Sequence, residues 1–187
     1  SINGTNNIWG INPNENGGYP FLSWQGYEHV TDFEDGNGTE QYPFQIASPE
    51  QLNKMRNYLE TPDVFFELVS DIDLAPYLAP NGAGHDMWGD EGWLPIGNIV
   101  NMFKGSLNGN DHNIAGLSIA REGDNIGLFG VIDAPSRIEN LHLSSVSISL
   151  PDGATSESVG ALVGYIYISG VSVTITNCSS SGEVQGG

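Results

Sequence analysis

Two aspartates, Asp71 and Asp73, are the first residues whose types and spacing could support chemistry. Because residues two apart in a strand project from the same face, their carboxylates would lie together, on the side opposite Ile72 and Leu74. Such a pair could bind Ca²⁺ or transfer protons in acid–base catalysis. No third ligand has an obvious position, so we interpret the pair as charges on a solvated strand face.

The segment His85–Trp93 is the richest candidate site, because it combines a histidine, three carboxylates and two tryptophans between Leu74 and Leu94. The sequence predicts that this segment is a loop. Loops on a rigid scaffold carry binding residues disproportionately, and an exposed tryptophan can stack on a sugar ring. Trp88 is therefore a candidate for ligand binding.

An acidic segment has the oxygen-rich side chains of a calcium loop, at Asp32, Glu34, Asp35, Asn37 and Glu40. An EF-hand loop requires alternating oxygen ligands, a glycine at its sixth position and a glutamate at its twelfth. No frame in this segment supplies all of them. We therefore favour a solvated acidic linker, and calcium remains the only cofactor that the sequence suggests.

The remaining nucleophile and base candidates do not form a catalytic motif. His112 and His142 lack a serine or cysteine nucleophile in a recognisable local pattern, so no triad is predicted. Cys178 is the only cysteine, which excludes an internal disulfide and a cysteine-rich metal site. It aligns with Leu117 and Leu141, which predicts a buried small hydrophobe. No catalytic residue is assigned, and metal ligands remain unknown.

The elements that would position these residues are short strands joined by tight turns. Apolar residues alternate with polar ones in three places, at Phe66, Leu68, Ile72 and Leu74, at Val146, Ile148 and Leu150, and at Val171, Val173 and Ile175. One segment, residues 48–59, predicts a helix, with Ser48 as N-cap, Pro49 in the first turn and Gln51 completing a capping box.

Two motifs repeat and interleave. The first is Ile-x-(Gly/Asn)-(Leu/Cys), and the second places glycines on either side of apolar residues. Copies of the first begin at Ile114, Ile138 and Ile175, and copies of the second are Gly127–Gly130 and Gly160–Gly164. A repeat without a helix cannot bury its apolar face alone, so the repeats predict a stacked β-solenoid. A β-sandwich is the alternative, because it also uses short strands and frequent turns.

These motifs resemble the GLUG-motif repeat family, whose Gly-Leu-x-Gly signature is matched by Gly127-Leu128-Phe129-Gly130. The resemblance runs from about residue 36 to residue 187. It implies an all-β, right-handed parallel β-helix with one short N-terminal capping helix, no catalytic residues and a core position for Trp93. One departure is Asp111, where the family usually has glycine at a left-handed turn.

The resemblance also suggests a division of the chain. Residues 1–28 are similar to the closing segment of a preceding repeat cassette, and residues 29–40 form an acidic, Gly-rich linker. Residues 41–63 are the lead-in with the capping helix, and residues 64–187 are the β-helix rungs. The chain therefore reads as the end of one cassette joined to most of another.

The net charge limits the partners. The 187 residues include 23 acidic and 5 basic side chains, giving −18 at pH 7, and this excess repels nucleic acid and anionic membranes. No apolar stretch is long enough for membrane insertion. The basic residues are scattered along the chain, which disfavours acidic polysaccharides as substrates; they are Lys54, Arg56, Lys104, Arg121 and Arg137.

The resemblance and the charge together predict a non-enzymatic repeat module of a secreted or cell-surface bacterial protein. Such a module would act as an adhesin-like stalk or binding surface, with a glycan or a protein of a host or neighbouring cell as partner. An open strand edge would allow end-to-end self-association. The alternatives are a fragment of a carbohydrate-active β-helix enzyme and an accessory region of a secreted peptidase.

Overall fold

The computed structural model describes residues 9–10, 21–22, 32–151, 153, 158–170 and 172–185. The chain divides into two compact units, Ser1–Thr31 and Asp32–Gly187. In the first unit, β1 (Trp9–Gly10) and β2 (Phe21–Leu22) pair in antiparallel fashion. The similarity of residues 1–28 to a closing segment stays a prediction.

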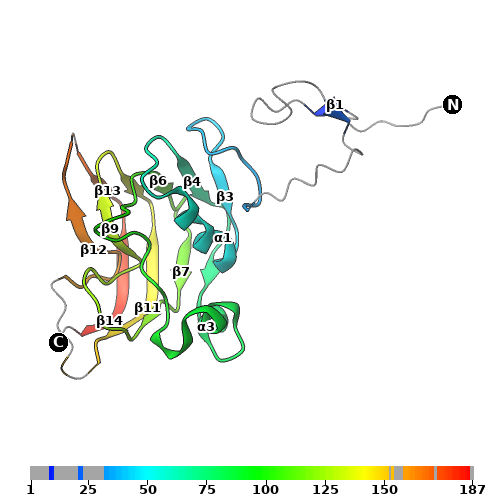
Figure 1. Ribbon diagram of the computed structural model, residues 1–187. Coiled ribbons are helices and arrows are strands. Elements are labelled where there is room, and N and C mark those ends of the chain that lie inside the picture. The colour runs from blue at the N-terminus through cyan, green and yellow to red at the C-terminus, as the bar shows by residue number, and fades with distance from the viewer. Residues whose placement is uncertain are drawn as a thin grey trace. The chain divides into compact units, whose positions relative to one another are not determined.

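The second unit is built from short parallel strands (Figure 1). The first sheet contains, in spatial order, β13 (Thr174–Thr176), β10 (Arg137–Glu139), β6 (Ser106–Asn108), β4 (Phe65–Leu68) and β3 (Phe44–Ile46). The second contains β14 (Ser179–Gln185), β11 (His142–Ser149), β7 (Asn113–Ala115) and β5 (Ile72–Asp73), with β8 (Ser118–Ile119) also on β11. A third pairs β12 (Val163–Tyr167) with β9 (Phe129–Asp133).

The register of these strands places apolar residues beside one another on the inward face, and the β11–β14 pair has one irregularity between Leu143 and Val146. In the first sheet one inward column joins Phe66, Leu107, Ile138 and Ile175. All the ladders in this unit's described strands are parallel, whereas the sheets of a β-sandwich are antiparallel. The predicted all-β class is confirmed, and the parallel pairing disfavours the sandwich alternative.

The core lies between the sheets. Phe66, Leu68, Ile72 and Leu74 are all at most 2% exposed, as their alternation predicts. Near β3 the core is aromatic, because ring centroids lie 4.6 to 5.8 Å apart in a cluster of Phe33, Phe44, Tyr58 and Phe66. The third predicted alternation begins at Val171, which lies outside the described residues.

The predicted helix forms as α1 (Pro49–Lys54), followed by the 3₁₀ turn η2 (Met55–Tyr58). Ser48 is the N-cap, since its hydroxyl accepts a hydrogen bond from the Gln51 N–H. The Gln51 side chain reaches back one residue further than in a standard capping box, to the N–H of Ala47. Leu52 and Met55 are fully buried, so this helix contributes directly to the core.

The prediction that the chain has a single helix is wrong. Two more short helices, α2 (Ala75–Leu78) and α3 (Ala83–Trp88), follow β5, with the 3₁₀ turn η3 (Gly89–Glu91) after them. The Asp73 carboxylate accepts a hydrogen bond from the Ala75 N–H, which anchors the start of α2. At four and six residues, both helices are too short for apolar periodicity to reveal them.

The glycine motif has a steric cause. Gly130 follows Phe129, which is paired with Ile96 on one side and Val163 on the other. A Cβ on Gly130 would lie 2.3 Å from the backbone oxygen of Gly97, closer than any side chain can approach. The motif therefore uses glycine because the backbones of neighbouring strands approach closely at this position of β9.

The turns between the first and second sheets are held by stacked asparagines. The Asn177 amide donates to Asn140 (2.8 Å), and the Asn140 amide donates to Asn108 (3.0 Å). Asn140 and Asn177 adopt φ values near +50°, and Asp111 adopts +60°. Asp111 thus takes the left-handed conformation expected at its position, although it is not glycine.

The two edges of the first sheet differ. At β3, residues just before the strand already pair with it, because Glu34 N–H donates to Gln45 O and Gln45 N–H donates to Asp35 O. At the other edge lies a last layer, defined here as β12, β13 and β14, which follows the layer formed by β9, β10 and β11. The last layer exposes apolar side chains that include Tyr165, Ile166, Ile175 and Val184.

Candidate functional site

The structure separates the roles of Asp71 and Asp73. Both are exposed, opposite buried Ile72 and Leu74, as the spacing predicts. The Asn113 N–H and, second, the His112 imidazole at 3.0 Å lower the pKa of the Asp71 carboxyl. Each aspartate therefore has its own structural contact: Asp71 binds the neighbouring strand, and Asp73 anchors α2.

The segment 85–93 is helical and not the predicted loop, because α3 and η3 occupy most of it. Trp93 is fully buried, as the resemblance implies, and its indole N–H donates to Leu128 O. Trp88 is half-buried, with its ring centroid 5.3 Å from that of Trp93, and the Arg56 guanidinium lies 5.3 Å from the Trp88 ring. These contacts account for Trp88 without a ligand.

The acidic segment is more ordered than a solvated linker. Phe33 is 2% exposed, and Asp32 forms an ion pair with Lys54 at 2.9 Å. The side-chain oxygen of Asn37 accepts hydrogen bonds from the N–H and the hydroxyl of Thr39, and Glu40 lies 3.6 Å from Arg137. Within the described residues, no group of three or more His, Cys, Asp or Glu side chains is arranged to hold a metal ion.

His112 lies in the turn before β7 and His142 begins β11, and each histidine lies near an aspartate. His142 lies 3.7 Å from Asp111, and its Nδ1 lies 2.8 Å from the Ser179 hydroxyl. Cys178 stands beside Leu141 of the neighbouring layer, as predicted, but Leu117 does not share this position, because Ile138 pairs with Leu107 and Ile114 pairs with Leu143. Burial raises the pKa of the Cys178 thiol. It is half-buried, so the predicted core position is reached only in part.

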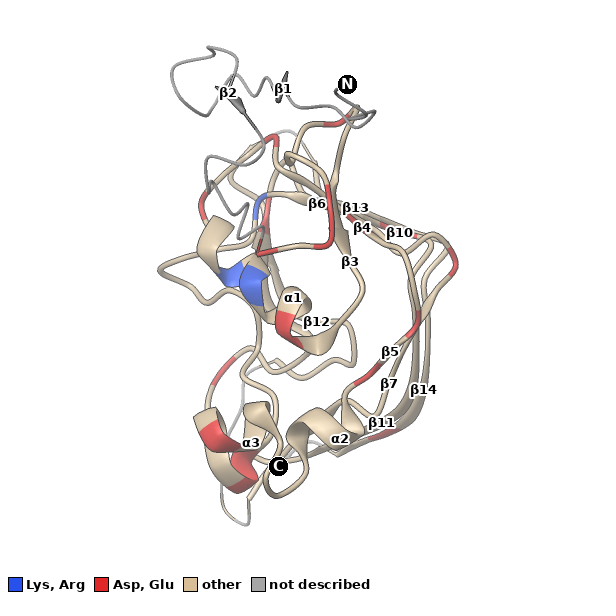
Figure 2. Ribbon diagram, turned by 90° about the vertical axis from the view of Figure 1, so that its right-hand side faces the viewer, with Lys and Arg blue, Asp and Glu red and all other residues tan. Residues whose placement is uncertain are grey.

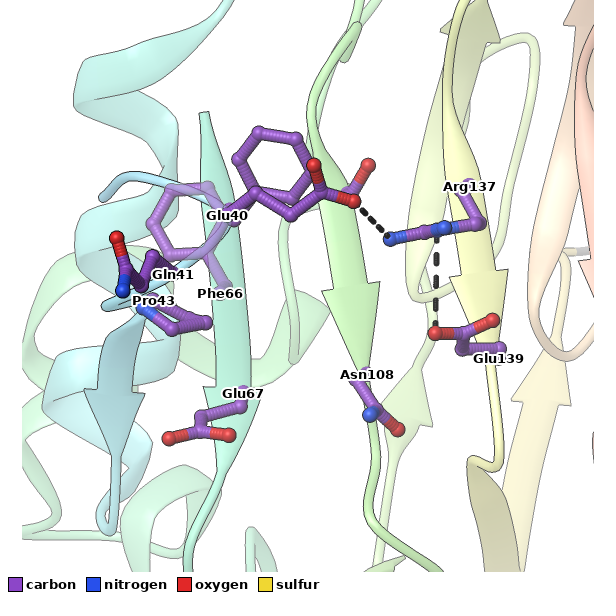
Figure 3. Close-up of a pocket in the computed structure, with 10 residues that line it drawn as sticks. Glu40, Gln41, Pro43, Phe66, Glu67, Asn108, Arg137 and Glu139 are labelled. Carbon is purple, nitrogen blue, oxygen red and sulfur yellow. Dashed lines mark ion pairs between the residues drawn. The ribbon is translucent and has the colours of Figure 1, made fainter. Parts of the chain in front are cut away.

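A groove that the sequence analysis did not identify lies on the outer face of the first sheet, with a volume of about 330 Å³. Two outward rows cross its strands. One row is Phe65, Ser106, Arg137 and Thr174, and the other is Gln45, Glu67, Asn108, Glu139 and Thr176. Figure 3 shows side chains of both rows together with Glu40 and Gln41 from the segment before β3.

Arg137 is the central cation of this groove. Its guanidinium lies 3.6 Å from Glu40 and 3.8 Å from Glu139, the two ion pairs drawn in Figure 3. Glu67 is held more firmly, because its two oxygens accept hydrogen bonds from the Gln45 and Asn110 amides. The Asn108 oxygen accepts from Asn110 N–H and from the Asn140 amide, so Asn108 can offer a ligand its NH₂ group.

A smaller hollow of about 220 Å³ adjoins the groove and shares Glu40, Phe65, Ser106 and Arg137 with it. It adds Asp63 and Lys104. Figure 2 shows acidic residues spread over turns, helices and strands, with Lys and Arg at few places. Arg137 and Lys104 are far apart in the sequence, but both line this hollow on one face of the first sheet.

A third hollow of about 340 Å³ lies between Leu59, Pro95 and Ile126 and includes Arg56 and Arg121. Burial, with a smaller effect of nearby Arg121, lowers the pKa of Arg56 to about 10. The Arg56 guanidinium nitrogens already donate to Asn53, Pro95 and Leu94 oxygens. Arg121 donates to Gly92 O and lies 3.4 Å from Glu91. Both arginines therefore have structural contacts, and we consider the groove on the first sheet as the candidate site.

The groove residues belong to three similar triplets, Phe65-Phe66-Glu67, Ser106-Leu107-Asn108 and Arg137-Ile138-Glu139. Each triplet has an apolar centre between outward residues, which is the signal that the sequence contains. What it does not contain is the register between strands that lie far apart in the chain. Without the register, the outward residues cannot be assigned to one surface.

None of the helices in the described part of the chain is long and apolar enough to span a membrane. No protein-family model matches the chain. It is 42% identical over 146 residues to a protein named as a candidate Gly-rich membrane protein, from Evansella cellulosilytica, and the match covers 76% of this chain and 16% of the relative. It is 31% identical over 156 residues to halomucin of Haloquadratum walsbyi, covering 81% of this chain and 2% of halomucin.

Among solved structures, the chain is similar to a candidate immunoglobulin A1 protease from Bacteroides ovatus. The TM-score is 0.53 and the identity 22%, with 82% of this chain and 41% of that protein covered. At this identity the likeness concerns the fold alone. The chain spans less than a fifth of either sequence relative, so it is similar to one part of much longer proteins.

Proposed function

We propose that the chain is a non-enzymatic repeat module of a bacterial extracellular or cell-surface protein, acting as an adhesin-like stalk or binding surface. The observation that carries the proposal is its similarity to small parts of two long proteins, one named as a membrane protein and the other as halomucin. The strong negative charge supports it, since acidic surfaces keep strand-rich proteins soluble outside the cell.

The proposal includes a right-handed parallel β-helix of the GLUG-motif repeat kind, with α1 as its N-terminal cap. Parallel ladders, inward columns of apolar residues and glycines where backbones meet support this architecture. Partners would contact the outward rows of the first sheet. Copies of the chain would associate end to end through the last layer, which exposes apolar strands.

A carbohydrate-active enzyme is the competing proposal, and one spacing favours it. Glu67 and Glu139 stand two strands apart, about 9.5 Å at ordinary strand spacing, near the upper limit for an inverting glycosidase. Such an enzyme needs one protonated carboxyl. Both Glu67 oxygens already accept hydrogen bonds, from the Gln45 and Asn110 amides, so Glu67 has structural contacts that account for it without a catalytic role.

Two measurements test the proposed function. Purified chain incubated with neutral and acidic polysaccharides should release no reducing ends or unsaturated products. Turnover that Glu139→Gln or Asp71→Asn abolishes would overturn the non-enzymatic role. Antibodies raised against the chain should label intact cells of the source organism, and labelling only after lysis would overturn the surface location.

A further inference from the structure

The groove on the first sheet holds a guanidinium that is loosely engaged. Charge-assisted hydrogen bonds between arginine and carboxylate have N···O distances of about 2.7 to 2.9 Å. The contacts of Arg137 with Glu40 and Glu139 are 3.6 and 3.8 Å long, and its side chain is 42% exposed. Arg137 can therefore turn its planar set of donors towards a ligand in the groove with little loss of existing contacts.

The charges around Arg137 select against anions. Three carboxylates, those of Glu40, Glu67 and Glu139, line the groove beside one guanidinium. The adjoining hollow adds one carboxylate and one ammonium, which leaves the balance negative. Since the whole chain carries −18, a ligand bearing carboxylate or sulfate groups is repelled both locally and at long range.

The remaining polar groups repeat with the strands. Glu67, Asn108 and Glu139 stand in one row on β4, β6 and β10, with neighbouring strands about 4.8 Å apart. They alternate acceptors with an NH₂ donor, and Figure 3 shows them on the three successive strands. Phe65 and Pro43 add apolar surface to the lining. Polar groups at fixed positions on a partly apolar wall are typical of small-molecule sites.

We infer that this groove binds a neutral, hydroxyl-rich chain, a short oligosaccharide laid across β4, β6 and β10. The inference rests on the proposed function, and it names the ligand class of the binding surface. Vicinal hydroxyls donate to the carboxylates and accept from Arg137 and Asn108, while a ring face covers Phe65. A cationic amine would be attracted by the carboxylates, but an ammonium group offers no acceptor for the donors of Arg137 and Asn108.

Calorimetric titration of the whole chain tests this ligand class. The neutral probes are cellohexaose, maltohexaose and mannohexaose, and the charged probes are hexagalacturonate and hexaglucosamine. At least one neutral probe should bind with a Kd below about 5 mM, and hexagalacturonate at least about tenfold more weakly. Arg137→Gln should weaken the neutral probe about tenfold or more, because it removes the forked donor.

Lys54→Gln is the matched control, since it also removes one cation but lies outside the groove. It should change the affinity less than about twofold. Thermal melting of both variants verifies that they fold, and Glu139→Gln provides a second groove variant that should also weaken binding. The inference is overturned if no neutral probe binds, if a charged probe binds more tightly, or if Arg137→Gln binds like the unchanged chain.

The outcomes also separate this inference from the proposed function. Cleavage of a bound neutral probe would overturn the non-enzymatic role and keep the ligand class. Surface labelling of intact cells without any saccharide binding would overturn the ligand class and keep the surface module.

Discussion

The last layer and the layer before it use the same kinds of residue at the same register positions, yet their burial differs. Ile138 is 0% exposed and its neighbour Ile175 is 38% exposed, while Ile148 at 1% stands beside Val184 at 43%. Their backbones are paired in parallel in the same way. The difference shows that an inward apolar side chain is fully buried only when a strand lies on each side of its own strand.

The largest loss of stability should come from shortening a buried side chain of an inward column, and its neighbour in the last layer provides the comparison. Ile138→Ala should lower the free energy of unfolding by about 3 kcal/mol, because it opens a cavity between neighbouring strands. Ile175→Ala should cost less than about 1 kcal/mol, because its side chain is partly exposed and loses less buried area. Urea unfolding measures both, and equal losses would show that the two layers do not differ energetically.

A second contrast concerns glycine. Gly130→Ala should destabilise the chain by about 2 kcal/mol, because its Cβ would meet the Gly97 backbone oxygen at 2.3 Å. Gly170→Ala is the matched change after β12, where the Cβ would lie 3.6 Å from the Ala134 side chain, an ordinary contact. It should be neutral within about 0.5 kcal/mol. Thermal melting compares the two, and a tolerated Gly130→Ala would contradict the steric role.

Asp133 connects the two layers and should give a pH-dependent effect. Its buried carboxylate, at the end of β9, accepts hydrogen bonds from Ser169 N–H and Oγ, just beyond β12. Burial alone would raise the pKa of Asp133, but the Ser169 and Ala134 hydrogen bonds and the charge of Lys104 together lower it. Asp133→Asn should cost about 1.5 kcal/mol at pH 7.

The sign of the pH dependence follows from that lowered pKa. The unfolded carboxyl has a pKa near about 3.9, so the stabilisation is complete above that pH and is lost as pH falls through the lower folded value. Unfolding free energies of the chain and of Asp133→Asn should therefore converge below about pH 4. A constant difference down to pH 2 would show that the ionised form of Asp133 contributes nothing.

The smallest effect on stability should come from charged substitutions in the last layer, which should instead change the self-association of the chain. Ile175→Lys combined with Val184→Lys should alter the unfolding free energy by less than about 1 kcal/mol, since both side chains are already exposed. The unchanged chain should self-associate with rising concentration, and the double variant should stay monomeric, because charged edges resist pairing. Light scattering measures the mass, and a monomeric unchanged chain would overturn the proposed end-to-end contact.

The repeating apolar positions were enough to predict the strand class and the core alternation around Ile72, and the capping residues Ser48, Pro49 and Gln51 were enough to predict the N-cap. These features are local, so a short window of sequence determines them. The helices α2 and α3 were missed because their four and six residues carry no full apolar period. Trp88 was assigned to an exposed loop because its packing partners Tyr77 and Arg56 are distant in the chain.

The groove could not be predicted because its residues become neighbours only through the register. Glu67, Asn108 and Glu139 belong to strands far apart in sequence, and nothing in each triplet says which others stand beside it. Arg137 looked like one of several scattered cations for the same reason. The contacts that hold Asp71 are likewise non-local, since Asn113 and His112 come from the neighbouring strand β7 and the turn before it.

The backbone pairing of Glu34 and Asp35 with Gln45 makes the two edges of the first sheet different, because the β3 edge is covered. A second copy cannot extend this sheet from β3, because the hydrogen-bonding groups of Gln45 are already satisfied there. Among the described strands of this sheet, β13 is therefore the edge left for pairing. In the proposed self-association, two copies would meet through this sheet with one β13 edge against another, a closed contact that does not propagate into a fibre.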